Sequence, residues 1–340
     1  MALGTNGSTI TTAANFIPKL WSDEVVAAYK QQLVLGNLVT KISFKGKKGD
    51  TLHLPVPARG AASAKAANTQ VTLIADTAGD ISVLIDKWFE YSKLYEDMAE
   101  MQALSSMRKF YTDDAGYALA KQQDQSLHLL GATFNGGVIT ATGTTSYEKA
   151  VIGGDGTTLF SGATPGNGTA LTDAGIRRMI QTLEDSDMNS SELSLVIPPV
   201  ESNALRAIPR FTEQAFVGTG DAIKTGMLGK LYGVEVFTST NCPWVQVDAG
   251  TSTQAVTFTG TTFTTGVDAL GMTVTISGAI TKYRAGMLLH KDAMCLATQM
   301  DIRTQSQYKQ EYLGTLVTSD TVYGVKELRD YAALAFIVPA

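Results

Sequence analysis

Histidine, cysteine and carboxylate side chains are the groups with which a chain of this size would perform catalysis or bind a metal ion. The three histidines, His53, His128 and His290, lie far apart, and none has a second histidine or a cysteine at the spacing of metal ligands. Cys295 follows His290 by five residues, which pairs a nucleophile with a base. On one strand an odd spacing places two side chains on opposite faces, so we expect neither catalysis nor a metal site.

Glycine-rich segments are the second kind of motif considered, because their backbone amides can bind phosphate groups. Residues 218–223 break the dinucleotide-binding pattern at its third glycine. Gly229-Lys230 is followed by Leu231 where a phosphate loop needs serine or threonine, and Lys224 stands where that loop needs glycine. The sequence therefore predicts no cofactor and no enzyme.

The composition narrows the class of protein further. Hydrophobic residues make up 44% and charged residues 17% of the 340 residues, whereas average chains carry about 25% charged residues. Disordered chains are rich in charge, so disorder is excluded. The apolar runs are too short for a membrane span, and the first residues have no secretory pattern. The low charge indicates a surface covered by neutral polar groups or by other protein.

The charge balance also bears on nucleic acid binding. The chain has 27 basic and 32 acidic residues, a net charge of −5. Its densest basic cluster, Lys45, Lys47 and Lys48, is typical of a solvated turn, whereas proteins that grip nucleic acid present a basic face. The two cysteines form no paired motif, so we expect both to be buried as small hydrophobic groups.

The first 85 residues predict two elements without a core of their own. Residues 1–14 are small and uncharged, and the helical spacing of Trp21 and Tyr29 predicts a short helix that ends at Gly36. A long β-hairpin follows, and its alternating apolar residues are Leu52, Leu54, Val56, Val71, Leu73, Ile81, Val83 and Ile85. Isolated hairpins are marginally stable in water, so this one should lie against another surface.

The remaining chain predicts a long helix and an α/β region. Residues 97–130 follow helical spacing, and a stretch rich in glycine and threonine, residues 131–168, marks a domain boundary. Thr172 can cap a helix, Leu193 begins a buried strand, and residues 200–207 predict a short helix.

The last part of the chain reads as β-structure. Residues 245–281 predict a β-rich insertion or flap. Residues 290–304 and 332–338 predict closing β-segments, joined by residues 308–316 and Tyr323-Gly324.

The order of these parts resembles the major capsid protein of tailed bacteriophages, which has the Hong Kong 97 type fold. Residues 45–55 (KGKKGDTLHLP) look like the family's entry into its extended loop, and residues 86–102 look like the return into its spine helix. Residues 229–243 are similar to the late strand of the axial domain, and residues 290–330 resemble the closing segment of the peripheral domain.

The resemblance implies an α+β fold of five parts. They are an N-terminal arm with a short helix (1–45), an extended β-hairpin loop (46–88), a peripheral domain with the spine helix (89–150), an axial α/β domain (151–285) and a return to the peripheral domain (286–340). Residues expected at subunit interfaces are Trp21, Tyr29, Lys47, Lys48, Leu52, Leu54, Arg59 and Lys65. Some family members crosslink a hairpin lysine to an asparagine; Lys65 lies near the tip, but no matching asparagine environment is evident.

The function implied by the resemblance is self-assembly, as hexamers and pentamers, into the icosahedral head shell of a virion made in the bacterial cytoplasm. The shell would enclose double-stranded DNA without sequence-specific binding. A portal protein is an implied partner, and a cement protein remains open. No charged helical segment precedes Phe16, so we expect a separate scaffolding protein.

Three alternatives stay open. An encapsulin-like compartment shell would share the fold, and a phage tail or decoration protein would lack the long central helix. A cytosolic hydrolase would require a convergent site that the spacing of its residues does not support.

Overall fold

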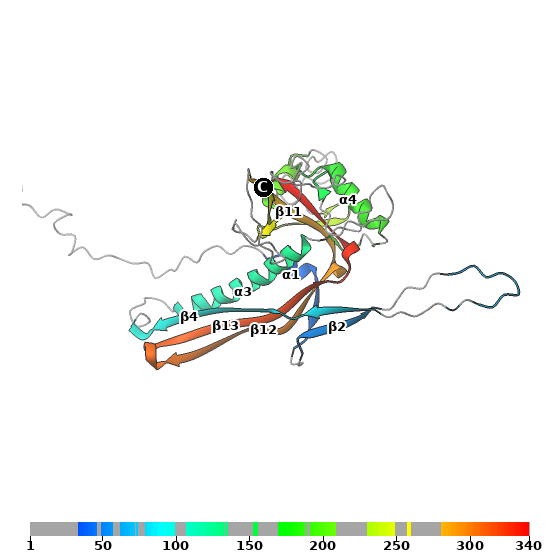
Figure 1. Ribbon diagram of the computed structural model, residues 1–340. Coiled ribbons are helices and arrows are strands. Elements are labelled where there is room, and N and C mark those ends of the chain that lie inside the picture. The colour runs from blue at the N-terminus through cyan, green and yellow to red at the C-terminus, as the bar shows by residue number, and fades with distance from the viewer. Residues whose placement is uncertain are drawn as a thin grey trace, which may run out of the picture.

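The computed structural model describes residues 33–45, 49–56, 62–71, 73, 79–98, 107–132, 134, 152–155, 169–186, 188, 191–208, 230–248, 257–259 and 280–339. Two β-sheets, a long helix, several shorter helices and a separate β-hairpin make up this part of the chain (Figure 1). The α+β class predicted from the sequence is confirmed.

The first sheet has four strands in the order β1-β12-β13-β4. Strand β1 (Thr40–Ser43) runs parallel to β12 (Met294–Lys309), and β13 (Gly314–Glu327) and β4 (Lys87–Glu96) extend the sheet with antiparallel pairing. Helix α3 (Met107–Gly131) runs along this sheet and packs mainly on β13 (Figure 1). It corresponds to most of the predicted long helix; residues 99–106 lie outside the described part.

Alternating burial in β4 shows which face of the first sheet the helix covers. Phe89 and Tyr91 belong to the covered face, and the Tyr91 hydroxyl donates a hydrogen bond to the Asp114 carboxylate of α3 at 3.2 Å. Trp88 and Leu94 belong to the opposite face and are exposed. One face of the first sheet is therefore covered by the chain itself, whereas the other carries exposed apolar side chains.

Strand β13 corrects an expectation from the sequence. The prediction that Tyr323-Gly324 is a connection is wrong, because Gly314–Glu327 form one continuous strand. The connection predicted over residues 308–316 is present but shorter, since only residues 310–313 lie between β12 and β13. The centre of β13 is polar yet buried between β12 and β4, at Ser319, Asp320 and Thr321. The buried centre of β13 therefore lacks the alternation of apolar and polar residues by which a strand is recognised in a sequence.

The second sheet contains the most deeply buried strands. Its main path consists of β10 (Thr257–Thr259), β9 (Trp244–Asp248), β11 (Ile280–His290), β6 (Leu193–Ile197), β8 (Val234–Thr238) and β7 (Lys230–Leu231), in that order. Strand β14 (Ala333–Pro339) pairs with β11 and with β5 (Ile152–Gly153). The predicted β-structure near residue 245 is thus present in β9, β10 and β11, while residues 249–256 and 260–279 lie outside the described part.

Two helices pack against the second sheet as the sequence predicts. Helix α4 (Asp173–Asp185) is capped by Thr172, whose hydroxyl oxygen accepts a hydrogen bond from the Gly175 amide at 3.0 Å. Its buried face packs with β6 and β14 in one apolar core. Helix α5 (Pro199–Arg206) begins at a proline, which is favoured in the first turn because its missing amide hydrogen would have no partner there.

The β-hairpin pairs β2 (Thr51–Val56) with β3 (Gly79–Leu84). Residues 62–71 lie well away from both sheets, and all of them are exposed (Figure 1). The prediction that Val71 and Leu73 continue the return strand is wrong, because neither residue is in a strand and no described segment covers them. The paired part of the hairpin is therefore shorter than the alternation predicts.

A further correction concerns Gly36, which does not end a helix. It lies inside the four-residue helix α1 (Leu35–Leu38). Most of the short helix predicted around Trp21 and Tyr29 falls on residues 1–32, outside the described part.

Gly324 of β13 supports the root of the hairpin. A Cβ at this position would overlap the backbone carbonyl of Leu84 and lie 3.2 Å from the Cα of Ile85. Backbone cannot yield as a flexible side chain can, so we expect Gly324→Ala to lower the free energy of unfolding by about 1–3 kcal/mol.

The matched control is Gly116→Ala in α3, where an added Cβ meets nothing within 4 Å. This change should raise the free energy of unfolding by roughly 0.5–1 kcal/mol, because alanine is the better helix former. Urea unfolding of both purified variants measures the difference. Unchanged stability of Gly324→Ala would show that the hairpin root is not supported by β13.

Candidate functional site

The sequence-predicted interface residues fall into separate parts of the chain. Leu52 and Leu54 lie on one face of β2, half-buried, in a small cluster with Val83, Cys295 and Ala297. Lys65 is exposed in the segment 62–71. Trp21, Tyr29, Lys47, Lys48 and Arg59 lie outside the described residues. The structure therefore brings Leu52 and Leu54 together and sets Lys65 apart from them.

The His290–Cys295 pair does not have the geometry of a nucleophile and its base. The two residues are not on one strand, as the sequence argument assumed: β11 ends at His290, a 3₁₀ turn follows, and Cys295 lies in β12. The Nδ1 atom of His290 accepts a hydrogen bond from the Asp292 amide at 3.2 Å. Cys295 is fully buried, and burial raises the pKa of its thiol to about 11.

Within the described ranges, no group of three histidine, cysteine or carboxylate residues could hold a metal ion. Of the helices in those ranges, none is long and apolar enough to cross a membrane.

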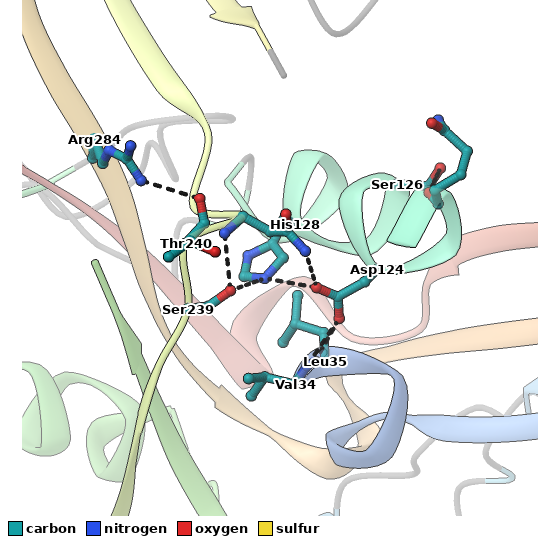
Figure 2. Close-up of polar contacts among 10 residues, drawn as sticks. Val34, Leu35, Asp124, Ser126, His128, Ser239, Thr240 and Arg284 are labelled. Atoms are coloured by element: carbon teal, nitrogen blue, oxygen red, sulfur yellow. Dashed lines mark hydrogen bonds and ion pairs between the residues drawn. The ribbon is translucent and has the colours of Figure 1, made fainter. Parts of the chain in front are cut away.

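A buried polar cluster joins three segments of the chain (Figure 2). At its centre lies Asp124 of α3, which is 2% exposed. Its Oδ1 atom accepts hydrogen bonds from the backbone amides of Val34 at 3.2 Å and Leu35 at 2.8 Å. Its Oδ2 atom accepts one from Nδ2 of Asn241 at 2.7 Å.

His128 completes the cluster one helical turn after Asp124. Its Nε2 atom lies 3.4 Å from the Asp124 Oδ2 atom and 3.0 Å from the Ser239 hydroxyl oxygen. The Ser239 oxygen also accepts a hydrogen bond from the Asn241 amide at 3.1 Å. Nδ1 of His128 is buried without a partner among the described residues. A hydrogen on Nε2 satisfies both neighbours, so this tautomer fits the cluster best.

The hydrogen bonds decide the charge state of Asp124. Burial alone would raise its pKa, but the hydrogen bonds from His128, Asn241 and Leu35 outweigh burial and lower the pKa. The carboxylate is therefore ionised at neutral pH although it is nearly removed from water. Such a group is stable only while its donors stay in place.

The open face of the first sheet presents a second polar arrangement. Arg303 of β12 donates two hydrogen bonds to the Asp320 carboxylate of β13, at 2.7 and 2.9 Å. The indole nitrogen of Trp88 donates to the same carboxylate at 3.3 Å. Hydrogen bonding from Arg303 lowers the pKa of Asp320. Trp88 is thereby held in one orientation while 72% of its surface is exposed.

Glu201 of α5 is a buried carboxyl group in the second sheet's core region. Its Oε2 atom accepts a hydrogen bond from the Leu171 amide at 2.7 Å. Burial raises its pKa above the ordinary value of 4.5, and the bond from Leu171 offsets this only in part.

We expect Glu201→Gln to stabilise the chain at neutral pH relative to the wild type. Above pH 4.5 the folded wild type binds more protons than the unfolded chain, so its stability falls as the pH rises through the raised pKa. Glutamine does not titrate and can still accept the Leu171 bond. Melting temperatures at pH 4 and pH 7 measure the effect, and an equal difference at both pH values would contradict it.

Comparisons with known proteins identify the fold. No protein-family model and no curated protein sequence matches the chain. The capsid structure of the cyanophage P-SCSP1u matches with a TM-score of 0.67 and 17% identity, over 99% of this chain and 96% of that one. A chain of Mycobacterium phage Che8 matches with a TM-score of 0.65 and 18% identity, over 95% and 97%.

The acidic stable capsid structure of the Helicobacter pylori bacteriophage KHP30 matches with a TM-score of 0.64 and 13% identity, over 100% of both chains. The chain therefore has the fold of these phage capsid structures, which confirms the capsid fold predicted from the sequence; its division into five parts stays a prediction.

Two features of the site were missed from the sequence. The only signal for the Asp124 cluster is the spacing of Asp124 and His128, which places both on one side of a helix. Their partners Val34 and Asn241 lie about 90 and 117 positions away, which no local pattern reveals. Trp88 gave no signal either, because the sequence alone does not distinguish an exposed aromatic residue in a strand from a buried one.

Proposed function

We propose that the protein is the major capsid protein of a tailed bacteriophage, and that it self-assembles into the icosahedral head shell that encloses the double-stranded DNA genome. The observation that carries this proposal is the match to capsid structures over nearly the whole length of both chains. A shared single domain would cover only part of each chain.

Exposed apolar surface at two separate places supports self-assembly. Leu73, near the hairpin tip, is 88% exposed, and Trp88 projects from the open face of the first sheet. Large exposed apolar side chains of this kind mark interaction surfaces. A contact of one place with the other on a second copy would be heterologous, and such contacts close into rings or continue as arrays.

The finer assignments extend the same proposal. The chain is divided into an arm (1–45), a hairpin loop (46–88), a peripheral domain (89–150), an axial domain (151–285) and a return segment (286–340). Strand β14 of the return segment contributes to the axial sheet by pairing with β11. Copies of the chain meet as hexamers and pentamers, with a separate scaffolding protein and a portal protein as partners. The shell is made in the bacterial cytoplasm, and its net charge of −5 suits DNA that is enclosed without being gripped.

The test is electron microscopy of particles pelleted at high speed after expression of the full chain with its genomic neighbours. Closed shells, or rings of five and six copies, are the expected result. A chain that stays monomeric with a scaffolding protein present would overturn the proposal. Shells that package a protein cargo in place of DNA would overturn the phage assignment in favour of a compartment shell.

Trp88→Ala is expected to reduce the yield of shells several-fold while leaving the folded subunit intact. The side chain is mostly exposed, so its removal should change the free energy of unfolding by less than about 1 kcal/mol. Buried tryptophans at interfaces contribute on the order of 2 kcal/mol each, repeated at every contact of the shell. Sedimentation measures shell yield, and urea unfolding measures subunit stability.

Ser92→Ala is the matched control, because Ser92 lies on the same exposed face of β4. It should leave both yield and stability unchanged. A wild-type yield for Trp88→Ala would exclude this face as a subunit contact.

A further inference from the structure

Helix α1 begins without a cap of its own. Val34 at its N-cap position makes no capping bond through its side chain, and its first turn has no acidic residue. The helix has four residues, far fewer than an isolated helix needs to be stable in water. Its first amide groups therefore require acceptors from elsewhere in the chain.

Asp124 supplies those acceptors from α3. Its Oδ1 atom receives the amides of Val34 and Leu35, so a side chain from the middle of one helix caps the beginning of another (Figure 2). The side chain of Leu35 is fully buried beside it. One carboxylate and the apolar packing of Leu35 thus hold the segment at the start of α1.

The second oxygen of the same carboxylate reaches the other sheet. Asn241 follows β8 and donates to Oδ2, and Ser239 fixes both Asn241 and His128. Asp124 is therefore bonded to three segments: the chain entering α1, helix α3 on the first sheet, and the loop after β8 of the second sheet.

We propose that Asp124 is a latch that holds the start of helix α1, at Val34 and Leu35, against α3, and that this latch opens without unfolding either sheet. Opening breaks the two bonds to Val34 and Leu35, while Asn241 and His128 continue to pair with the carboxylate. Since α1 has no other cap, its first amides are then left without acceptors, while the apolar packing of Leu35 and the pairing of β1 with β12 still hold the rest of the segment. The latch goes beyond the proposed function, because it is a property of the single subunit.

Hydrogen exchange of the purified, unassembled chain tests the latch. Asp124→Asn keeps the size of the side chain but removes its charge, so its carbonyl oxygen can accept the Val34 and Leu35 amides only without charge assistance. The amides of Val34 and Leu35 should then exchange roughly tenfold faster or more, the effect of losing one charge-assisted hydrogen bond. Amides of β6 and β13 should keep their wild-type rates.

Two variants serve as controls. Asp114→Asn makes the same change on the same helix, where the carboxylate bonds to Tyr91, and it should leave Val34 and Leu35 unaffected. The double variant Asp124→Asn/Asn241→Asp restores a donor–acceptor pair between the two side chains but leaves a neutral amide facing Val34 and Leu35, so exchange at both amides should stay fast. Recovery of slow exchange would show that the pair with residue 241, and not the cap on α1, controls these amides.

Two further results would overturn the proposal: wild-type exchange at Val34 and Leu35 in Asp124→Asn, or an equal acceleration across both sheets. Should that variant fail to fold, the wild type decides the question in low concentrations of urea. A latch that opens locally gives exchange at Val34 and Leu35 that is faster than in β6 and nearly independent of urea. Exchange that matches β6 in rate and urea dependence would show that no separate opening exists.

Discussion

Removing a carboxylate from water is unfavourable unless hydrogen bonds replace its hydration. Asp124 meets this condition only where three segments come together: the chain entering α1, helix α3 and the loop after β8. If one segment is displaced, the others are left around a poorly paired charge. This requirement ties the first sheet, the second sheet and the entering chain into one relative placement, which apolar packing alone, being non-directional, would specify less sharply.

Around that junction the two sheets differ in how completely the chain covers them. The second sheet has α4 and α5 packed on it, and β6 and β14 are buried along almost their whole length. The first sheet has α3 on one face only, and the hairpin extends beyond it with residues 62–71 wholly exposed (Figure 1). Only 17% of the residues are charged, so the chain has few charged side chains with which to cover these exposed apolar groups. Under the proposed function, contacts between copies of the chain would bury these surfaces.

Local patterns were sufficient for elements whose burial follows a regular period. Thr172 predicted the start of helix α4, and the run beginning at Leu193 predicted β6. The pattern failed in β13, where buried polar residues bond to neighbouring strands and to α3, and at Leu73, where alternation exists without pairing. The capsid fold was predicted from the order of the arm, hairpin, long helix and α/β region along the chain, because this order is informative even though each single motif is weak.

The candidate site was less predictable than the fold. Asp124 and His128 are one helical turn apart, but whether they face a core or solvent depends on Val34 and Asn241, which only the folded chain brings near. The orientation of Trp88 likewise depends on Asp320, more than two hundred positions away. Interactions of this kind follow from the tertiary structure and leave no spacing in the sequence.

The two sulfur atoms of the cysteines have a consequence for how copies of the chain can be joined. Cys242 and Cys295 are both fully buried, and burial raises the pKa values of their thiols to about 12 and about 11. At neutral pH fewer than about one in a thousand of these groups is a thiolate, the form that attacks a disulfide. Oxidation of these buried thiols therefore cannot form disulfide bonds between neighbouring copies unless a subunit first opens. The redox state of the surroundings therefore does not act through the cysteines on contacts between folded copies.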